Sequence, residues 1–199
     1  MSVESIVIAT DLNKTFKAEQ KGLDDVQALQ GINMQIKTGQ LTALVGPDGA
    51  GKTTFLRLIA GLYKPTAGSL EVLGMDVAKD PQSVQDRISY MPQKFGLYED
   101  LSIQENLDLY ADLHGVPMNV RKERFARLLK ITDLARFTER PAGKLSGGMK
   151  QKLGLACTLV RSPELLLLDE PSVGVDPLSR RDLWIIIEQL VREENLSVI

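Results

Sequence analysis

The octapeptide at residues 46–53 reads Gly46-Pro47-Asp48-Gly49-Ala50-Gly51-Lys52-Thr53 and matches the pattern G-x-x-x-x-G-K-[ST] at every fixed position. Leu41–Val45 before it is a short apolar segment that we expect to form a buried strand. Thr53–Ala60 after it carries apolar residues at helical spacing. Glycines between a strand and a helix let successive backbone N–H groups converge on phosphate oxygens. We therefore predict a phosphate-binding loop that continues to Thr54.

The last residues of this loop supply its charge and its metal ligand. The positive end of the following helix would face the anion, Lys52 would reach the β- and γ-phosphates, and the Thr53 hydroxyl would bind Mg²⁺. The alternative is a glycine-rich turn that binds nothing, which the flanking strand and helix disfavour. A dinucleotide-binding loop fits less well, because the pattern is not G-x-G-x-x-G and a lysine fills its end.

A second candidate site follows the segment Glu164–Leu168, in which every residue after Glu164 is leucine. Such a run is typical of a strand that is buried on both faces of a parallel sheet. The strand ends in Asp169-Glu170-Pro171, and ligand groups of parallel sheets lie at the carboxyl ends of their strands. We expect Asp169 beside the phosphate loop as a Mg²⁺ ligand, and Glu170 as the residue that orients or deprotonates an attacking water. The alternative is an ordinary acidic turn, since many strands end in one.

The remaining chain is expected to fall into regions of different character. Ile6–Ala9 and Ala28–Ile36 have strand patterns and are separated by a polar loop at Lys17–Asp25. A turn at Ala67–Gly68 is expected to precede another strand at Ser69–Leu73. The expected helices are Ser102–Leu113, which opens with a capping box of Ser102 and Glu105, then Arg121–Lys130, Met149–Val160 and Leu178–Glu193, with a last strand beginning at Leu196–Ile199.

Composition limits the class of protein. The 199 residues are 43% hydrophobic and 25% charged with a net charge of -2, which is typical of a globular domain and gives no sign of a nucleic-acid partner. A single cysteine, Cys157, excludes an internal disulfide and is expected to be a buried thiol in a reducing compartment. The N-terminal residues lack a basic leader, so we expect no secretory signal. No apolar stretch approaches the roughly 18–20 residues that span a bilayer.

Between the two candidate sites, the segment Leu145-Ser146-Gly147-Gly148-Met149-Lys150-Gln151 resembles the signature motif L-S-G-G-Q of ABC ATPases. The order of the motifs is also that of the family, and the resemblance covers the chain from the first strand to the last residue. Residues 93–102, followed by Glu105-Asn106-Leu107, resemble bacterial multidrug exporter ATPases of the ABC-2 type, especially subunits with two nucleotide domains in tandem.

The resemblance implies an α/β fold of the P-loop NTPase class, with a RecA-like core, an N-terminal antiparallel β subdomain and an inserted α-helical subdomain. We expect the β subdomain at 1–40 and 66–90, the core at 41–65 and 163–199, and the helical subdomain at 94–162. The chain ends where the family continues with further strands and a switch histidine, so we expect a C-terminally truncated domain. His114 is expected to be a solvated residue at a helix end.

The resemblance also implies ATP and Mg²⁺ as cofactors and gives roles to further residues. Phe16 would stack on adenine, with a surface-strand aromatic as the alternative. Gln93 would contact Mg²⁺ and the attacking water. The signature residues Ser146, Gly147 and Gly148 would bind the γ-phosphate of an ATP held by a second subunit, and a serine hydroxyl with glycine amides at a helix N-terminus suits an anion. Asp176 would contact the opposite subunit.

The family pairs two nucleotide-binding domains head to tail on integral membrane subunits. The resemblance therefore implies an ATP-driven exporter motor that is cytoplasmic, at the inner face of the cell membrane. Phe95, Leu97 and Tyr98 would form an exposed docking groove for the membrane subunit, with local packing of the helical subdomain as the alternative. The basic face formed by Arg121, Lys122, Arg124 and Arg127 is expected to be solvated.

Two other functions remain open from the sequence. A soluble ABC ATPase acting on ribosomes or DNA would share every motif, although such proteins tend to carry basic or coiled-coil segments that are not visible here. A nucleotide-binding half-site that does not turn over is consistent with Met149, where the family has glutamine, and with the absent switch histidine.

Overall fold

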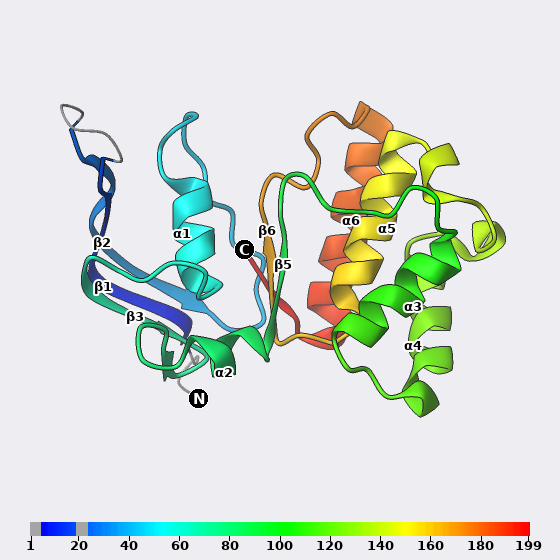
Figure 1. Cartoon of the computed structure of the whole chain (residues 1–199), viewed down its shortest axis with the longest axis horizontal. Coiled ribbons are helices and arrows are strands. Elements are labelled where there is room, and N and C mark those ends of the chain that lie inside the picture. Colours follow the sequence, from blue (N-terminus) through cyan, green and yellow to red (C-terminus); the bar gives the residue numbers. More distant parts are fainter. Residues whose placement is uncertain (1–4, 19–23) are drawn as a thin grey trace. The chain divides into compact units, whose positions relative to one another are not determined.

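The computed structural model describes residues 5–18 and 24–199, and its α/β chain divides into two compact units (Figure 1). The first unit comprises the described residues up to Ile88, with Glu164–Leu167 and Glu194–Ile199. The second comprises Ser89–Pro163 and Leu168–Glu193. The N-terminal residues and part of the polar loop expected at Lys17–Asp25 lie outside the described residues.

An antiparallel sheet dominates the first unit. Its strands β1 (Ser5–Phe16), β2 (Val26–Lys37), β3 (Ala67–Val72) and β4 (Met75–Asp76) have the order β2-β1-β3-β4, and β1 pairs with both β2 and β3. The strands expected at Ile6–Ala9 and Ala28–Ile36 are confirmed as parts of β1 and β2. Alternating apolar residues of these strands form a buried face, which includes Val7, Leu12, Leu70 and Val72.

Two expectations for this unit are wrong. Ala67–Gly68 is not a turn but the start of β3, where Ala67 pairs with Asn13 and Gly68 packs directly on the backbone of Asp11. Leu41–Val45 is not a strand: within the described residues only Leu41 forms a bridge, to Val198, and Val45 is exposed. This segment meets β7 (Ser197–Val198) only at its start, where Thr42 N–H donates to the Val198 carbonyl and Val198 N–H donates to the Gln40 carbonyl.

The helices of the first unit are α1 (Lys52–Ile59) and α2 (Pro81–Gln85). α1 buries Phe55, Leu56, Leu58 and Ile59, which confirms the helix expected after the glycine-rich loop. A second sheet has the strand order β5-β6-β7, in which β5 (Ile88–Met91) and β6 (Leu165–Leu168) have residues in both units. β6 is buried along its whole length and pairs in parallel with β7, as its unbroken leucine run predicts.

The second unit is helical. It contains α3 (Ile103–Leu113), α4 (Met118–Ile131) and α5 (Gly147–Leu159), most of α6 (Pro177–Glu194), and two short 3-10 helices, η1 (Ala135–Phe137) and η2 (Ala142–Lys144). Figure 1 shows α5 and α6 side by side, with α3 and α4 packed against α5. The capping box is confirmed, since Ser102 N–H donates to the Glu105 carboxylate and Glu105 N–H donates to the Ser102 hydroxyl.

The expectation that Arg121 lies on a solvated face of α4 is wrong. Arg121 is buried: its guanidinium donates to the Val116 carbonyl at 2.9 Å and pairs with Asp112 at 2.7 Å. The solvated face therefore excludes Arg121. His114, in contrast, is exposed at the C-cap of α3, as expected. Within the described residues, no helix is both long enough and apolar enough to cross a membrane.

Candidate functional site

The phosphate loop lies in the first unit and ends at the N-terminus of α1. Gly46–Ala50 is exposed, and Gly51 is the N-cap of α1 with a φ of 88°, in the left-handed region that favours glycine. A Cβ atom at Gly51 would lie 2.5 Å from the Ala28 carbonyl oxygen and 2.7 Å from a methyl carbon of Leu29. The last fixed glycine of the motif is therefore required both by its backbone conformation and by its close approach to β2.

Lys52 folds back over this loop. Its Nζ donates to the carbonyl oxygens of Gly46 and Pro47, each at 2.9 Å, so the ammonium group is held on the loop that precedes it. Thr53 lies in the first turn of α1 and is half-buried. An ammonium group, loop N–H groups and a helix N-terminus in one place suit a polyphosphate.

The acidic pair lies in the second unit, where it meets the glutamine proposed from the sequence. Asp169 follows β6, is only 4% exposed, and accepts a hydrogen bond from the Tyr90 hydroxyl at 2.9 Å. Glu170 has a φ of 53°, which is uncommon for a non-glycine residue and is found preferentially at functional sites. Gln93 Nε2 donates to Glu170 Oε2 at 3.1 Å. The structure thus brings Gln93 and Glu170 together.

Tyr90 was not predicted as a site residue. It lies on β5, and its hydroxyl fixes Oδ2 of Asp169, while Asp169 N–H donates to the Met91 carbonyl at 2.9 Å. The sequence signal was its place in the strand just before Gln93. The position of Asp169 beside the phosphate loop stays a prediction, because the loop and the acidic pair belong to different units.

The signature residues form the start of α5. Ser146 is the N-cap, and its hydroxyl accepts from Met149 N–H at 3.3 Å, so the residue that departs from the family pattern contributes through its backbone. Gly147 is exposed, and a Cβ atom there would have its nearest neighbour, the Gly174 carbonyl oxygen, at 3.9 Å. Gly148 is buried, and a Cβ atom there would overlap the Ser179 side chain on α6. The two glycines therefore face different surroundings.

Asp176 already has a role within this chain. Its Oδ1 accepts from the N–H groups of Leu178 at 3.1 Å and Ser179 at 3.0 Å, which caps the N-terminus of α6. Hydrogen bonds from the Ser179 side chain and backbone lower the pKa of this carboxyl. Its contact with an opposite subunit stays a prediction.

Phe16 is the last residue of β1 and is half-buried. Its ring packs edge-on against Tyr63, with centroids 5.3 Å apart at 78°, and the Lys14 ammonium lies 4.9 Å from the Phe16 centroid. The aromatic ring is thus held by its neighbours, and its stacking on adenine stays a prediction. Tyr63 is a further aromatic that the sequence reasoning did not single out.

The predicted Mg²⁺ ligands fit a hard cation. Thr53 offers a hydroxyl, Asp169 a carboxylate and Gln93 an amide oxygen, and Mg²⁺ prefers oxygen ligands while it keeps several waters. Among the described residues there is no cluster of three or more His, Cys, Asp or Glu side chains that could hold a metal without a substrate.

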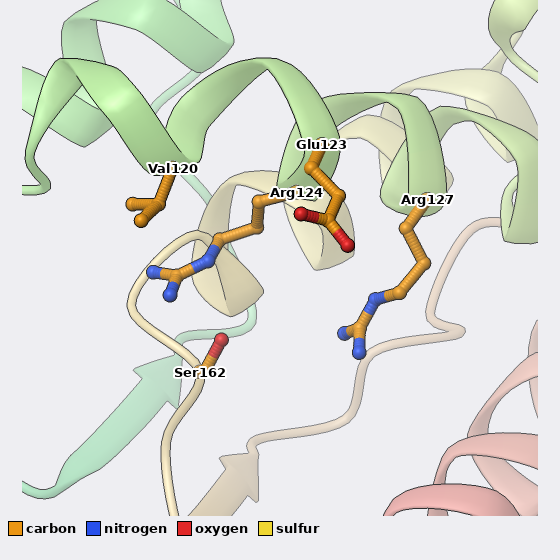
Figure 2. A pocket seen from close by; sticks show the side chains of 5 residues that line it. All are labelled: Val120, Glu123, Arg124, Arg127 and Ser162. Carbon is orange, nitrogen blue, oxygen red and sulfur yellow. The ribbon is translucent and has the colours of Figure 1, made fainter.

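A pocket of about 280 Å³ lies beside α4 and is lined by none of the motif residues described above (Figure 2). Figure 2 shows Glu123, Arg124 and Arg127 extending from the same side of α4, with Ser162 on the loop opposite. Arg124 donates to the Val160 carbonyl at 2.6 Å and so caps the C-terminus of α5. One side chain that lines the pocket therefore also ties α4 to the end of α5.

The phosphate loop at a helix N-terminus and the Asp-Glu pair after a buried parallel strand define an α/β protein of the P-loop NTPase class. The family described as "ABC transporter" matches residues 29–173, and the chain belongs to this family as an ATP-binding domain. It is 54% identical over 193 residues to the probable multidrug ABC transporter ATP-binding protein YbhF of Escherichia coli K12. That match covers 97% of this chain and 32% of YbhF, so the chain spans about a third of that relative.

Other relatives agree on the family. The bacitracin transport ATP-binding protein BcrA of Bacillus licheniformis is 35% identical over 98% of this chain and 61% of its own length. Among solved structures, cbiO1 of Clostridium perfringens, part of the ABC transporter complex cbiONQ, has a TM-score of 0.86 at 27% identity over 98% of this chain and 77% of its own. The dimeric post-hydrolysis cassette MJ0796, bound to ADP and Pi, has a TM-score of 0.82 at 26% identity. This match covers 96% of this chain and 85% of the MJ0796 chain.

Proposed function

We propose that this chain is the ATP-hydrolysing motor domain of an exporter. Two such domains would pair head to tail around Mg-ATP and act on integral membrane subunits at the inner face of the cell membrane. The observation that carries the proposal is the contact of Gln93 with Glu170, directly after Asp169. A turnover site needs a base and a group that positions water, and a simple nucleotide-binding module needs neither.

Each site residue has a part in the proposed reaction. The backbone N–H groups of the loop residues 46–51 other than Pro47, together with the Lys52 ammonium, bind and orient the phosphates, and Thr54 extends this loop. Thr53, Asp169 and Gln93 would hold Mg²⁺, which supplies neutralisation of phosphate charge when it is bound. Glu170 takes a proton from the attacking water at its carboxylate, while the Gln93 amide orients that water.

The remaining residues complete the nucleotide from two directions. The Phe16 ring would stack on adenine, since its edge contact with Tyr63 leaves it a firmly held aromatic group. Ser146, Gly147 and Gly148 of a second copy would bind the γ-phosphate at the N-terminus of α5. The dimeric MJ0796 structure supports such pairing as a precedent in the family.

Transport rather than another use of ATP is supported by the names of the relatives. YbhF is described as a probable multidrug transporter protein, BcrA serves bacitracin transport, and cbiO1 is part of a transporter complex. The membrane subunit would dock at residues 94–101. In this segment only Tyr98 among the three proposed docking residues is exposed, while Phe95 stacks on Tyr110 with centroids 5.1 Å apart. Local packing therefore accounts for Phe95.

The test is to measure ATP binding and phosphate release side by side with Mg²⁺. Lys52→Ala is expected to weaken ATP binding about tenfold or more, because it removes a charge-assisted hydrogen bond to phosphate. Glu170→Gln is expected to keep binding and to lower release about a hundredfold or more, because it removes the base. Lys37→Ala and Glu188→Gln, both on exposed residues, serve as matched controls.

Other outcomes contradict the proposal in different ways. Release that is unchanged in Glu170→Gln would remove Glu170 as the base. Binding without any release, even when a complete nucleotide-binding domain is supplied as partner, would support the half-site function that Met149 allows. A chain that binds no ATP although circular dichroism shows it folded would overturn the assignment of the phosphate loop.

A further inference from the structure

The backbone that leads into the signature is hydrogen-bonded to the segment that follows Gln93. Ile103 N–H donates to the Arg140 carbonyl at 3.1 Å, and Ala142 N–H donates to the Leu101 carbonyl at 2.8 Å. Gly143 N–H donates to the Glu99 carbonyl at 2.9 Å, where the two backbones approach closely. Residues 99–103 and 140–143 therefore form one connected piece immediately before Ser146.

A fully buried amide holds this piece in shape. Asn106 Nδ2 donates to the carbonyl oxygens of Tyr98 at 3.0 Å, Leu101 at 3.2 Å and Ser102 at 2.9 Å, and its Oδ1 accepts from Tyr98 N–H at 3.0 Å. A buried polar side chain that is satisfied on both sides fixes the loop around it. Glu99 follows directly after Tyr98, so its backbone position is set by these bonds.

The Glu99 side chain then reaches the signature helix. Its Oε1 lies 2.6 Å from Lys150 Nζ, with the Glu99 side chain 65% exposed and the Lys150 side chain 32% exposed. Lys150 lies in the first turn of α5, and its N–H donates to the Ser146 carbonyl at 2.9 Å. The first turn of α5 is thereby tied to the segment after Gln93 through the backbone before Ser146 and through a side chain after it.

We propose that Glu99 and Lys150 are a positioning pair for the signature motif, which fixes the direction of Ser146, Gly147 and Gly148 toward the γ-phosphate of a second copy. The inference rests on the proposed function, in which the signature acts on the partner's nucleotide. Neither residue belongs to the ATP-contacting set. An exposed ion pair contributes little to folding on its own, so its effect should appear in pairing rather than in stability.

The experiment measures ATP-dependent dimerisation in the Glu170→Gln background, where bound ATP would persist. Glu99→Lys and Lys150→Glu each replace an attraction by a repulsion, and the double variant restores the pair with reversed charges. Each single variant is expected to weaken ATP-dependent dimerisation about fivefold, and the double variant to return within about twofold of the parent. Sedimentation velocity gives the dimer constant, and a fluorescent nucleotide gives the ATP affinity of the monomer, which is expected to stay unchanged.

Asp133→Lys is the matched control, because it reverses one partner of an exposed ion pair, with Arg136, that does not involve α5. Single variants that dimerise like the parent, or a double variant that shows the summed loss of both, would overturn the positioning role. So would a loss of dimerisation that follows a fall in melting temperature. A parent that binds ATP but never dimerises overturns the proposed pairing itself, which separates that failure from failure of the positioning pair.

Discussion

Gly148→Ala offers a sharp test of how the signature helix is packed. Gly148 is a buried residue of the first turn of α5, and an added Cβ atom would overlap the Cβ and Oγ atoms of Ser179 on α6. The neighbouring Gly147 is exposed, and the nearest atom to an added Cβ would be the Gly174 carbonyl oxygen at 3.9 Å, an ordinary contact. The same substitution can thus be made at two adjacent positions, one crowded by a neighbouring helix and one with room for a methyl group.

The expected changes in the free energy of unfolding differ between the two variants. Overpacking a well-filled contact costs about 1–3 kcal/mol, because the helices must separate or the side chains must leave their rotamers. Replacing a helical glycine by alanine gains up to about 1 kcal/mol. Gly148→Ala is therefore expected to lose about 1–2 kcal/mol in net free energy of unfolding, whereas Gly147→Ala is expected to be neutral or slightly more stable.

The measurement is urea denaturation followed by circular dichroism. Ser179→Gly should rescue Gly148→Ala, because it removes both overlapping atoms while the backbone N–H that Asp176 accepts remains. The double variant should recover most of the loss, apart from about 0.5 kcal/mol for the glycine introduced into α6 and the lost hydrogen bond from the Ser179 hydroxyl to Asp176. Equal stability of the two alanine variants, or a double variant less stable than Gly148→Ala, would refute the packing argument.

Three other predictions concern different parts of the chain. Gly51→Ala is expected to lower the free energy of unfolding by about 2–4 kcal/mol, because the new side chain clashes with β2 and the backbone is left-handed. Gly74→Ala has a similar φ of 74° but no described atom within 4 Å, so it should cost only about 1–2 kcal/mol. Urea denaturation of both variants measures the difference. Hydrogen bonds from Arg87 lower the pKa of the Glu164 carboxyl in the folded protein. The carboxylate therefore stabilises the fold fully above its ordinary pKa of 4.5, and this stabilisation is lost as the pH falls through the lowered pKa of the folded state. Glu164→Gln should therefore cost under about 1 kcal/mol at pH 7, since the pair is half exposed, and should flatten the acid limb of a stability–pH curve. Burial raises the pKa of the Cys157 thiol, so Cys157 should resist alkylation by iodoacetamide at pH 8 until the chain is unfolded, as mass spectrometry would show.

The features that the sequence predicted well depend on residues close together in the chain. The capping box of Ser102 and Glu105 is a relation between i and i+3, and β6 is read from an unbroken run of leucines. Lys52 at the start of α1 follows from the motif itself. In each case the pattern that predicts the feature lies within one short window of sequence, although the strands that pair with β6 lie elsewhere in the chain.

The failures have a non-local cause. Leu41–Val45 has the composition of a strand, but a strand also needs a pairing partner, and within the described residues only Leu41 of this segment forms a bridge. Arg121 is of a residue type that is usually solvated, but its guanidinium donates to the Val116 carbonyl and pairs with Asp112, and these partners allow it to be buried. Composition therefore predicts what a segment can do, and the available partners decide what it does.

The same reasoning explains why the signature motif could be recognised from the sequence, whereas the residues that hold it in place could not. Ser146 caps α5 with its own hydroxyl, which a motif reveals. Lys150 and Glu99, in contrast, are 51 positions apart, and Asn106 holds the turn that carries Glu99. Ser179 likewise constrains Gly148 from another helix. Packing therefore leaves no room for a side chain at Gly148 but leaves room for one at Gly147, and only contacts across the fold tell the two glycines apart.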